Sequence, residues 1–143
     1  MPQGSVLGPL LFLLFINDLP YATNLKVKLF ADDTLLSMES DNYENLKTEV
    51  NIEINRVHKW LCANKLTLNF SKSKYMIIAN KTKPPEEEFE VKINNVKLDR
   101  CSSYKYLGIF IDEDLSWKPH ISYLCEKSNQ SMWNVRQTKI LCK

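Results

Sequence analysis

The chain has 143 residues, a net charge of +2, 44% hydrophobic residues and 25% charged residues. These values are typical of one globular domain of ordinary size, and they exclude a wholly disordered chain. The most apolar stretch, residues 6–16, is shorter than the ~20 residues that span a bilayer. It also contains Gly8 and Pro9, so the sequence predicts no membrane segment.

The first predicted element is a helix over residues 6–17, which follows a turn at residues 1–5 and is capped by Ser5. From Leu10 to Ile16 this helix is apolar on all sides, a pattern typical of a helix buried between other elements. We therefore expect it to lie inside the fold.

A β-hairpin is predicted next. Residues 26–30 alternate polar and apolar side chains, as a strand with one solvent-exposed face does, and residues 34–38 predict a second strand. Asp32 and Asp33 lie between the two strands. The pattern therefore predicts a hairpin with exposed carboxylates at its tip.

Residues 41–63 predict a long amphipathic helix, with Asp41 and Glu44 in a capping-box pattern and Asn64 as a left-handed end. The rest of the chain alternates short strands with turns before a second amphipathic helix. The predicted elements are a strand at 74–79, a hairpin of 89–93 and 96–98 that turns at Asn94-Asn95, a strand at 104–111 and a helix at 117–141. The sequence thus predicts an α+β fold.

Positive charge is concentrated in two segments that contain no acidic residue. The first holds Arg56, Lys59, Lys65, Lys72, Lys74, Lys81 and Lys83, and the second holds Lys127, Arg136, Lys139 and Lys143. Such segments either follow a phosphate backbone or form a solvated lysine-rich surface, and charge alone leaves both readings open.

Cysteine, tryptophan and histidine residues are interpreted mainly as packing residues. Cys62, Cys101, Cys125 and Cys142 match no zinc-binding or redox spacing, and no secretory signal is visible, which predicts reduced thiols in an intracellular protein, nuclear or cytoplasmic. The helical contexts of Trp60, Trp117 and Trp133 favour packing over base stacking, and His120 is interpreted in the same way.

Asp32 and Asp33 are the strongest candidates for chemistry. Two adjacent carboxylates repel each other and resist burial, so they require water, a turn or a cation. One reading is a hairpin turn, where Asp is a favoured residue. The other is a site for Mg²⁺, which prefers carboxylate oxygens and can assist phosphoryl transfer.

Four segments carry a family resemblance through their order and spacing. They are Pro2-Gln3-Gly4-Ser5-Val6-Leu7-Gly8-Pro9, Phe30-Ala31-Asp32-Asp33, Leu68-Asn69-Phe70-Ser71-Lys72-Ser73 and Tyr106-Leu107-Gly108. In this order they resemble motifs B, C, D and E of a reverse transcriptase palm, and their residues are most similar to the non-LTR retrotransposon branch. The resemblance covers nearly the whole chain.

The resemblance implies a role for each matching position. Asp32 corresponds to the metal ligand of motif C, Asp33 to its weaker neighbour and Phe30 to the aromatic position of that motif. Gln3 and Gly4 correspond to residues near the incoming nucleotide and the template. Gly4 also suits a turn, so either reading stands.

The downstream motifs imply two further roles. Lys72 matches the motif D lysine, which acts as a proton donor or a countercharge at phosphates, and a solvated lysine is the alternative. Tyr106, Leu107 and Gly108 resemble the primer grip, and a core strand with a bulge at Gly108 is the alternative.

The family implies an activity in which a primer 3′-hydroxyl attacks a deoxynucleotide triphosphate on an RNA template. This activity would use two Mg²⁺ ions, with Mn²⁺ as a substitute. Residues 1–103 would form the C-terminal half of the palm, with helices on a small antiparallel sheet. Residues 104–143 would form the primer-grip strand and the start of the thumb.

The sequence lacks the family's fingers and the aspartate of motif A, and both of its ends interrupt predicted elements. We therefore expect a fragment that is inactive alone and marginally stable. The apolar helix at residues 10–16 would normally pack against the missing elements, so its exposed face should form a large apolar patch. The alternatives are a noncatalytic remnant that binds nucleic acid or a partner, and part of a longer reading frame.

Overall fold

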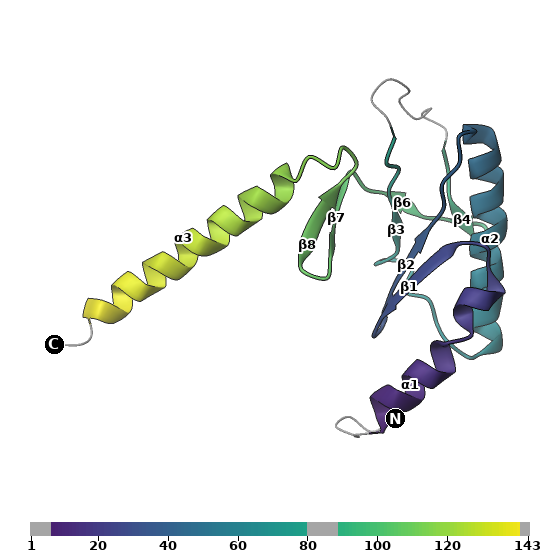
Figure 1. Ribbon diagram of the computed structural model, residues 1–143, viewed down its shortest axis with the longest axis horizontal. Coiled ribbons are helices and arrows are strands. Elements are labelled where there is room, and N and C mark those ends of the chain that lie inside the picture. The colour runs from purple at the N-terminus through teal and green to yellow at the C-terminus, as the bar shows by residue number, and fades with distance from the viewer. Residues whose placement is uncertain (1–6, 80–88, 141–143) are drawn as a thin grey trace. The chain divides into compact units, whose positions relative to one another are not determined.

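The computed structural model describes residues 7–79 and 89–140, with side chains up to residue 130 and at Met132 (Figure 1). Some sequence-based assignments lie outside the described residues. They concern Gln3, Gly4, Ser5, the loop at 81–88, the side chain of Trp133 and Cys142. The chain divides into two compact units. The first comprises residues 1–74 and 86–99, and the second comprises residues 75–85 and 100–143.

The first unit begins with α1 (Gly8–Ile16), followed by a 3-10 turn, η1 (Leu19–Ala22). Pro9 lies in the first turn of α1, where its missing amide hydrogen costs nothing. The predicted burial of α1 is wrong for most of its length, and the expected exposure of its apolar side chains is confirmed instead. Its exposed side chains are Leu10, Leu11, Leu13, Leu14 and Phe15, at 54%, 51%, 54%, 66% and 42% of their area, whereas Ile16 is buried. Burial of an apolar helix is favourable, but it requires neighbouring elements that cover the helix.

The predicted first hairpin is confirmed. β1 (Lys26–Phe30) pairs antiparallel with β2 (Asp33–Ser37) in a register that runs from Lys26 opposite Ser37 to Phe30 opposite Asp33. Exposed and half-buried residues alternate along β1, as its polar–apolar pattern predicts.

The long amphipathic helix is also confirmed, as α2 (Tyr43–Ala63). Its N-cap is Asn42, not the predicted Asp41: Asn42 has an extended backbone, and its side chain accepts a hydrogen bond from the Asn45 amide at 3.2 Å. At the other end, Lys65 adopts the left-handed conformation, with φ of 57°, in place of the predicted Asn64.

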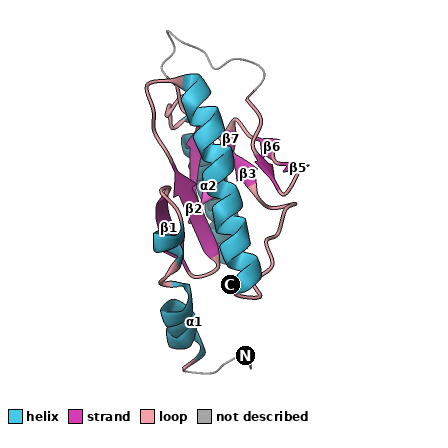
Figure 2. Cartoon of the chain, turned by 90° about the vertical axis from the view of Figure 1, so that its right-hand side faces the viewer, coloured by secondary structure: helices cyan, strands magenta, loops and turns pink. Residues whose placement is uncertain are grey.

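The core of the first unit lies between α2, η1 and the first hairpin, and α2 runs beside this hairpin (Figures 1 and 2). Four buried side chains form its centre: Ile16, Leu19, Leu25 and Val57. Partly buried residues pack around them: Phe12, Val27, Leu29, Leu36, Met38, Trp60 and Leu61. Apolar residues of α2 spaced three or four apart thus meet the inner face of the hairpin.

A second hairpin packs against α2. It consists of β4 (Lys92–Ile93) and β5 (Val96–Lys97), and it turns at Asn94 and Asn95, whose φ values are 48° and 65°. Two positive φ values define the turn type expected for an Asn-Asn loop, so this prediction is confirmed. Phe89, Val91, Ile93 and Leu98 are its buried side chains.

Two asparagines of α2 hold β4 in place. The Asn51 side chain donates to the Glu90 carbonyl at 2.9 Å and accepts from the Lys92 amide at 2.7 Å. One turn later, Asn55 donates to the Lys92 carbonyl at 3.1 Å and accepts from the Asn94 amide at 2.9 Å. The two amide groups thus bond the backbone of alternate residues, as a neighbouring strand would.

The predicted strand at 74–79 is much shorter than expected. Only β3 (Lys74–Tyr75) forms, and it pairs with β6 (Asp99–Arg100). Met76 and Ile77 are half-buried, although they lie outside any strand. The apolar residues after Tyr75 are therefore partly buried without forming strand hydrogen bonds.

The second unit contains a hairpin and a long helix. The predicted single strand at 104–111 is wrong: β7 (Ser103–Tyr106) and β8 (Ile109–Asp112) form a hairpin that turns at Leu107 and Gly108. The predicted last helix is confirmed as α3 (Lys118–Ile140). Asp112 orders the segment before α3. Its carboxylate accepts hydrogen bonds from Ser116 Oγ at 2.7 Å and from the amides of Ser116 and Trp117 at 3.0 and 3.1 Å.

The predicted α+β class is confirmed, since helices accompany small antiparallel hairpins in the described part of the chain. No helix within residues 7–79 and 89–140 has both the length and the apolar character needed to cross a bilayer.

Candidate functional site

The tip of the first hairpin presents two carboxylates to solvent. Ala31 and Asp32 form the turn, and Asp33 starts β2 opposite Phe30. Asp32 and Asp33 are exposed, as predicted, and Phe30 exposes 59% of its area beside them. Ala31 adopts φ of 50°, a left-handed conformation that costs a residue with a Cβ roughly 1 kcal/mol. The tight turn therefore places both acids at the end of the hairpin.

These two carboxylates supply only part of a metal site. Hard cations such as Mg²⁺ take oxygen ligands, and adjacent exposed aspartates provide them. Within the described residues, however, no three side chains of the His, Cys, Asp or Glu type come together as a group that could hold an ion. Asp32 and Asp33 can therefore supply part of a metal centre, but within the described residues they do not complete one.

Lys72 is presented by a turn that Asn69 organises. The Asn69 carbonyl accepts from the Ser73 amide at 3.0 Å and from Ser73 Oγ at 2.8 Å, and its side-chain oxygen accepts from Ser71 Oγ at 2.8 Å. The Lys72 amide also donates to the Asn69 carbonyl, at 3.2 Å. The Lys72 side chain is exposed. The sequence analysis gave Asn69 no role, although Asn followed by two serines within four positions is a recognisable turn signal.

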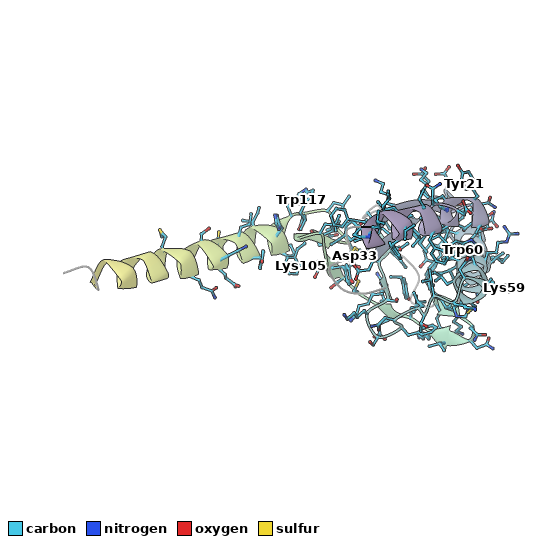
Figure 3. All side chains as sticks on the ribbon, turned by 90° about the horizontal axis from the view of Figure 1, so that it is seen from below. Tyr21, Asp33, Lys59, Trp60, Lys105 and Trp117 are labelled. Atoms are coloured by element: carbon cyan, nitrogen blue, oxygen red, sulfur yellow. The ribbon has the colours of Figure 1, made fainter. Side chains whose placement is uncertain are left out.

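The basic segment after Arg56 is only partly available for a ligand. Arg56 Nη1 is 2.6 Å from Glu53 Oε1, so its charge is compensated. Lys59, Lys65 and Lys74 are exposed, and Lys59 projects from α2 (Figure 3). For brevity we call the four exposed lysines of residues 56–74 the lysine face: Lys59, Lys65, Lys72 and Lys74.

Glu53 is a buried acid that sequence analysis missed. It accepts from the Asn24 amide at 2.7 Å, from Thr23 Oγ1 at 2.9 Å and from Asn24 Nδ2 at 3.2 Å. The hydrogen bond from the Asn24 amide is the main reason that the pKa of Glu53 lies below its usual value, and Thr23 and Arg56 act in the same direction. This carboxylate fixes α2 to the segment that leads into β1, so it supports the hairpin that carries Asp32.

The second candidate site is the tip of the β7–β8 hairpin. Leu107 and Gly108 form its turn with φ values of 48° and 87°. Leu107 exposes 46% of its area, and Tyr106 is half-buried. Glycine tolerates such a φ freely, whereas leucine does so at a cost. The tip therefore holds Leu107 in a backbone conformation that is unfavourable for a residue with a Cβ.

An aromatic and cationic cluster joins this hairpin to the first turns of α3. Lys105 Nζ lies 4.5 Å from the ring centroid of Tyr123 and 5.7 Å from that of Phe110, and it donates to Tyr123 Oη at 3.2 Å (Figure 3). The Phe110 and Tyr123 ring centroids are 5.2 Å apart. The hydrogen bond from Lys105 is the main cause that lowers the pKa of Tyr123. The cluster therefore combines cation–π attraction with ring packing.

The remaining aromatic predictions have mixed outcomes. Trp60 packs against the first core, as expected. Trp117 does not: it exposes 50% of its area and adopts φ of 62° just before α3 (Figure 3). His120 packs as expected, with its Nδ1 accepting from the Phe110 amide at 3.5 Å and its ring stacked on Tyr123.

The structure brings only some of the predicted site residues together. Phe30, Asp32 and Asp33 share one hairpin, and Lys72 lies on a separate turn of the same unit. Tyr106, Leu107 and Gly108 share the tip of a hairpin in the other unit.

Comparison with protein families matches residues 1–111 to the family described as reverse transcriptase (RNA-dependent DNA polymerase). Curated relatives agree. The chain is 31% identical over 144 residues to the probable RNA-directed DNA polymerase from transposon BS of Drosophila melanogaster. This match covers 95% of the chain and 16% of the relative.

Two further relatives from Drosophila melanogaster show the same pattern. They are the probable RNA-directed DNA polymerase from transposon X-element, 29% identical over 85% of this chain, and the RNA-directed DNA polymerase from mobile element jockey, 28% identical over 85% of it. In both cases the match spans 14% of the relative's own length. No solved structure matches the chain. The comparisons confirm the resemblance to non-LTR retrotransposon reverse transcriptases.

Proposed function

Because the chain belongs to the reverse transcriptase (RNA-dependent DNA polymerase) family, we propose that it forms the motif B to motif E part of an RNA-directed DNA polymerase. The observation that carries this proposal is the exposed pair Asp32 and Asp33 on a tight hairpin tip, with Phe30 beside them. The chain spans about one-seventh of the length of the curated relatives, so the whole polymerase activity is part of the proposal.

In this proposal residues 1–103 are the C-terminal half of a palm, and residues 104–143 are the primer grip and the start of a thumb. The observed hairpin of β7 and β8, which replaces the expected single strand, and the helix α3 that follows it are compatible with the second assignment. The Lys105–Tyr123 contact gives this hairpin a fixed support from α3.

Each site residue then has a task. Asp32 and Asp33 would hold Mg²⁺, or Mn²⁺ in its place, together with at least one further carboxylate. This ion supplies charge neutralisation at the reacting phosphate. Phe30, with Gln3 and Gly4, would contact the nucleotide and the template. Lys72 would neutralise the departing pyrophosphate or donate a proton to it.

Tyr106, Leu107 and Gly108 would contact the primer strand near its reacting end. The turn leaves the Leu107 side chain exposed at the hairpin tip, and Gly108 has no side chain, so a nucleic-acid backbone can approach there closely. The lysine face would hold the phosphates of the template or the primer.

A second candidate function is a noncatalytic remnant that binds nucleic acid or a partner. It is favoured by the incomplete metal centre in the described residues and by the exposed leucines of α1. Both candidates predict binding without synthesis for the isolated chain. They differ in what happens when a complementary segment with an acidic strand is supplied.

The test is primer extension on an RNA template with Mg²⁺ or Mn²⁺. We expect no extension by the chain alone, because two carboxylates cannot hold two ions in a catalytic geometry. Extension restored by a separately expressed fingers and motif A segment, and lost in Asp32→Asn, would support the polymerase. Extension that Asp32→Asn leaves intact would contradict the assignment of the tip.

Binding is tested by a salt titration with a single-stranded oligonucleotide. If the four residues of the lysine face each contact one phosphate, the slope of log K against log salt is about −3, and each Lys→Gln change reduces it by roughly 0.7. Lys47→Gln, in the first half of α2 and outside the lysine face, is the matched control and leaves the slope unchanged.

A further inference from the structure

One cysteine and one histidine of α2 form a contact that the proposed polymerase function does not use. Cys62 Sγ lies 3.6 Å from Nε2 of His58, one helical turn earlier. Residues four apart share one helix face, so the pair is preformed by α2 itself. The Cys62 side chain is exposed.

The His58 ring also contacts an aromatic side chain. Its ring packs against Phe70, with ring centroids 6.1 Å apart and planes tilted by 55°. The imidazole therefore does not have to be ordered when the thiol reacts, which lowers the entropic cost of the contact.

The chain provides two other described thiols for comparison. Cys101 is half-buried, and its Sγ donates to the Tyr75 carbonyl at 3.5 Å. Cys125 is exposed on α3. Thiol reactivity depends on access and on a nearby proton acceptor. Cys101 has limited access, Cys125 has access, and Cys62 has access together with an imidazole.

We propose that Cys62 is a thiol-modification site that undergoes disulfide exchange with low-molecular-weight disulfides, with His58 as the proton acceptor. In the tautomer that leaves Nε2 unprotonated, His58 accepts the proton of Cys62 Sγ. The sulfur then attacks one sulfur of the disulfide and forms a new S–S bond. The original S–S bond breaks, and the second sulfur leaves as a thiolate, so no external oxidant is required.

Local charge favours an anionic disulfide such as oxidised glutathione. Lys59 is exposed and lies three residues before Cys62, which places it on the same face of α2. Because His58 is the proton acceptor in contact with Cys62 Sγ, the reactivity of Cys62 is expected to depend on the histidine.

The test compares Cys62 and Cys125 within one molecule. The full chain is incubated with oxidised glutathione at neutral pH, and the modified fraction of each cysteine is followed by peptide mass spectrometry. We expect Cys62 to react roughly two- to tenfold faster than Cys125, the range given by one net hydrogen bond to the reacting sulfur. Equal or slower reaction of Cys62 in the unaltered chain overturns the proposal, whatever the variants do.

Two controls separate the causes. His58→Phe keeps a ring against Phe70 and removes the nitrogen, so the ratio of the Cys62 rate to the Cys125 rate should fall to one or below, with the helix content unchanged by circular dichroism. A ratio that stays above twofold would show that His58 is not the acceptor. Iodoacetamide, an uncharged reagent, should preserve the preference for Cys62 in the unaltered chain. A preference seen with glutathione and absent with iodoacetamide would assign the effect to Lys59 and overturn the role of His58.

Discussion

The two asparagines that hold β4 provide a quantitative test of the fold. Besides one hydrogen bond within α2, to the Lys47 carbonyl, Asn51→Ala removes two hydrogen bonds to the backbone of residues 90 and 92. A net hydrogen bond contributes about 1 kcal/mol, so the two lost contacts with residues 90 and 92 cost roughly 2 kcal/mol. Alanine stabilises the helix by about 0.6 kcal/mol relative to asparagine because of its higher helix propensity. We therefore expect a net loss of about 1.4 kcal/mol in the free energy of unfolding.

The matched control is Asn45→Ala, which changes an exposed residue of the same helix. It gains the same propensity without losing a bond to β4, so urea unfolding should place the two variants about 2 kcal/mol apart. Asn51 and Asn55 both bond the backbone of Lys92, and the double variant should therefore lose less than the sum of the single losses.

Hydrogen exchange gives the assay residue-level resolution. Asn51→Ala should speed exchange of the Lys92 amide and spare that of Asn94, whereas Asn55→Ala should do the reverse, because each asparagine accepts from a different amide. If both variants unfold like Asn45→Ala and neither amide loses its protection, Asn51 and Asn55 do not hold β4 in place.

Three other predictions concern local features. Leu107→Asn should stabilise the β7–β8 hairpin by about 1 kcal/mol, because Asn-Gly is preferred where both φ values are positive, and it should weaken primer binding in the same oligonucleotide titration. Glu90→Gln should flatten acid unfolding: hydrogen bonds from Lys92 and then Lys97 lower the pKa of Glu90 from 4.5 to about 2, so its stabilising effect is complete above pH 4.5 and is lost as the pH falls toward 2. Asp112→Ala removes three hydrogen bonds before α3, and it should reduce helical circular dichroism and unfold the hairpin–helix unit at lower urea concentration.

Local patterns were enough to predict most elements. The alternation over residues 26–30, the apolar spacing in α2 and the Asn94-Asn95 pair each produced the expected element. The prediction of exposed acids at the hairpin tip succeeded for the same reason, since two adjacent carboxylates seldom lie inside a strand. The β7–β8 hairpin was not predicted, because its turn residues, Leu107 and Gly108, are not a typical turn pair. Leucine rarely adopts a positive φ, so the sequence did not indicate a turn at Leu107.

Other features depend on contacts that a single sequence does not display. Burial of Glu53 follows from donors about thirty residues earlier, at Thr23 and Asn24. Exposure of the α1 leucines depends on neighbours and not on their own pattern. Asp41 and Asn42 both carry a side-chain oxygen that could cap α2, so the sequence alone could not distinguish them. Asn42 is the N-cap because its backbone is extended there.

The asparagine contacts with β4 also bear on aggregation. A two-stranded hairpin normally leaves both outer edges open, and an open edge can recruit a strand from another molecule. On β4 the outer backbone groups of residues 90, 92 and 94 already bond to Asn51 and Asn55, so no foreign strand can add there without displacing α2. Within the described residues no side chain bonds the outer backbone of the first hairpin in this way, and Lys28 and Lys26, which pairs with Glu39, are the charged side chains on β1 that discourage edge-to-edge association. Neutralising these two lysines would therefore make the β1 edge more prone to strand addition, while the β4 edge would stay protected.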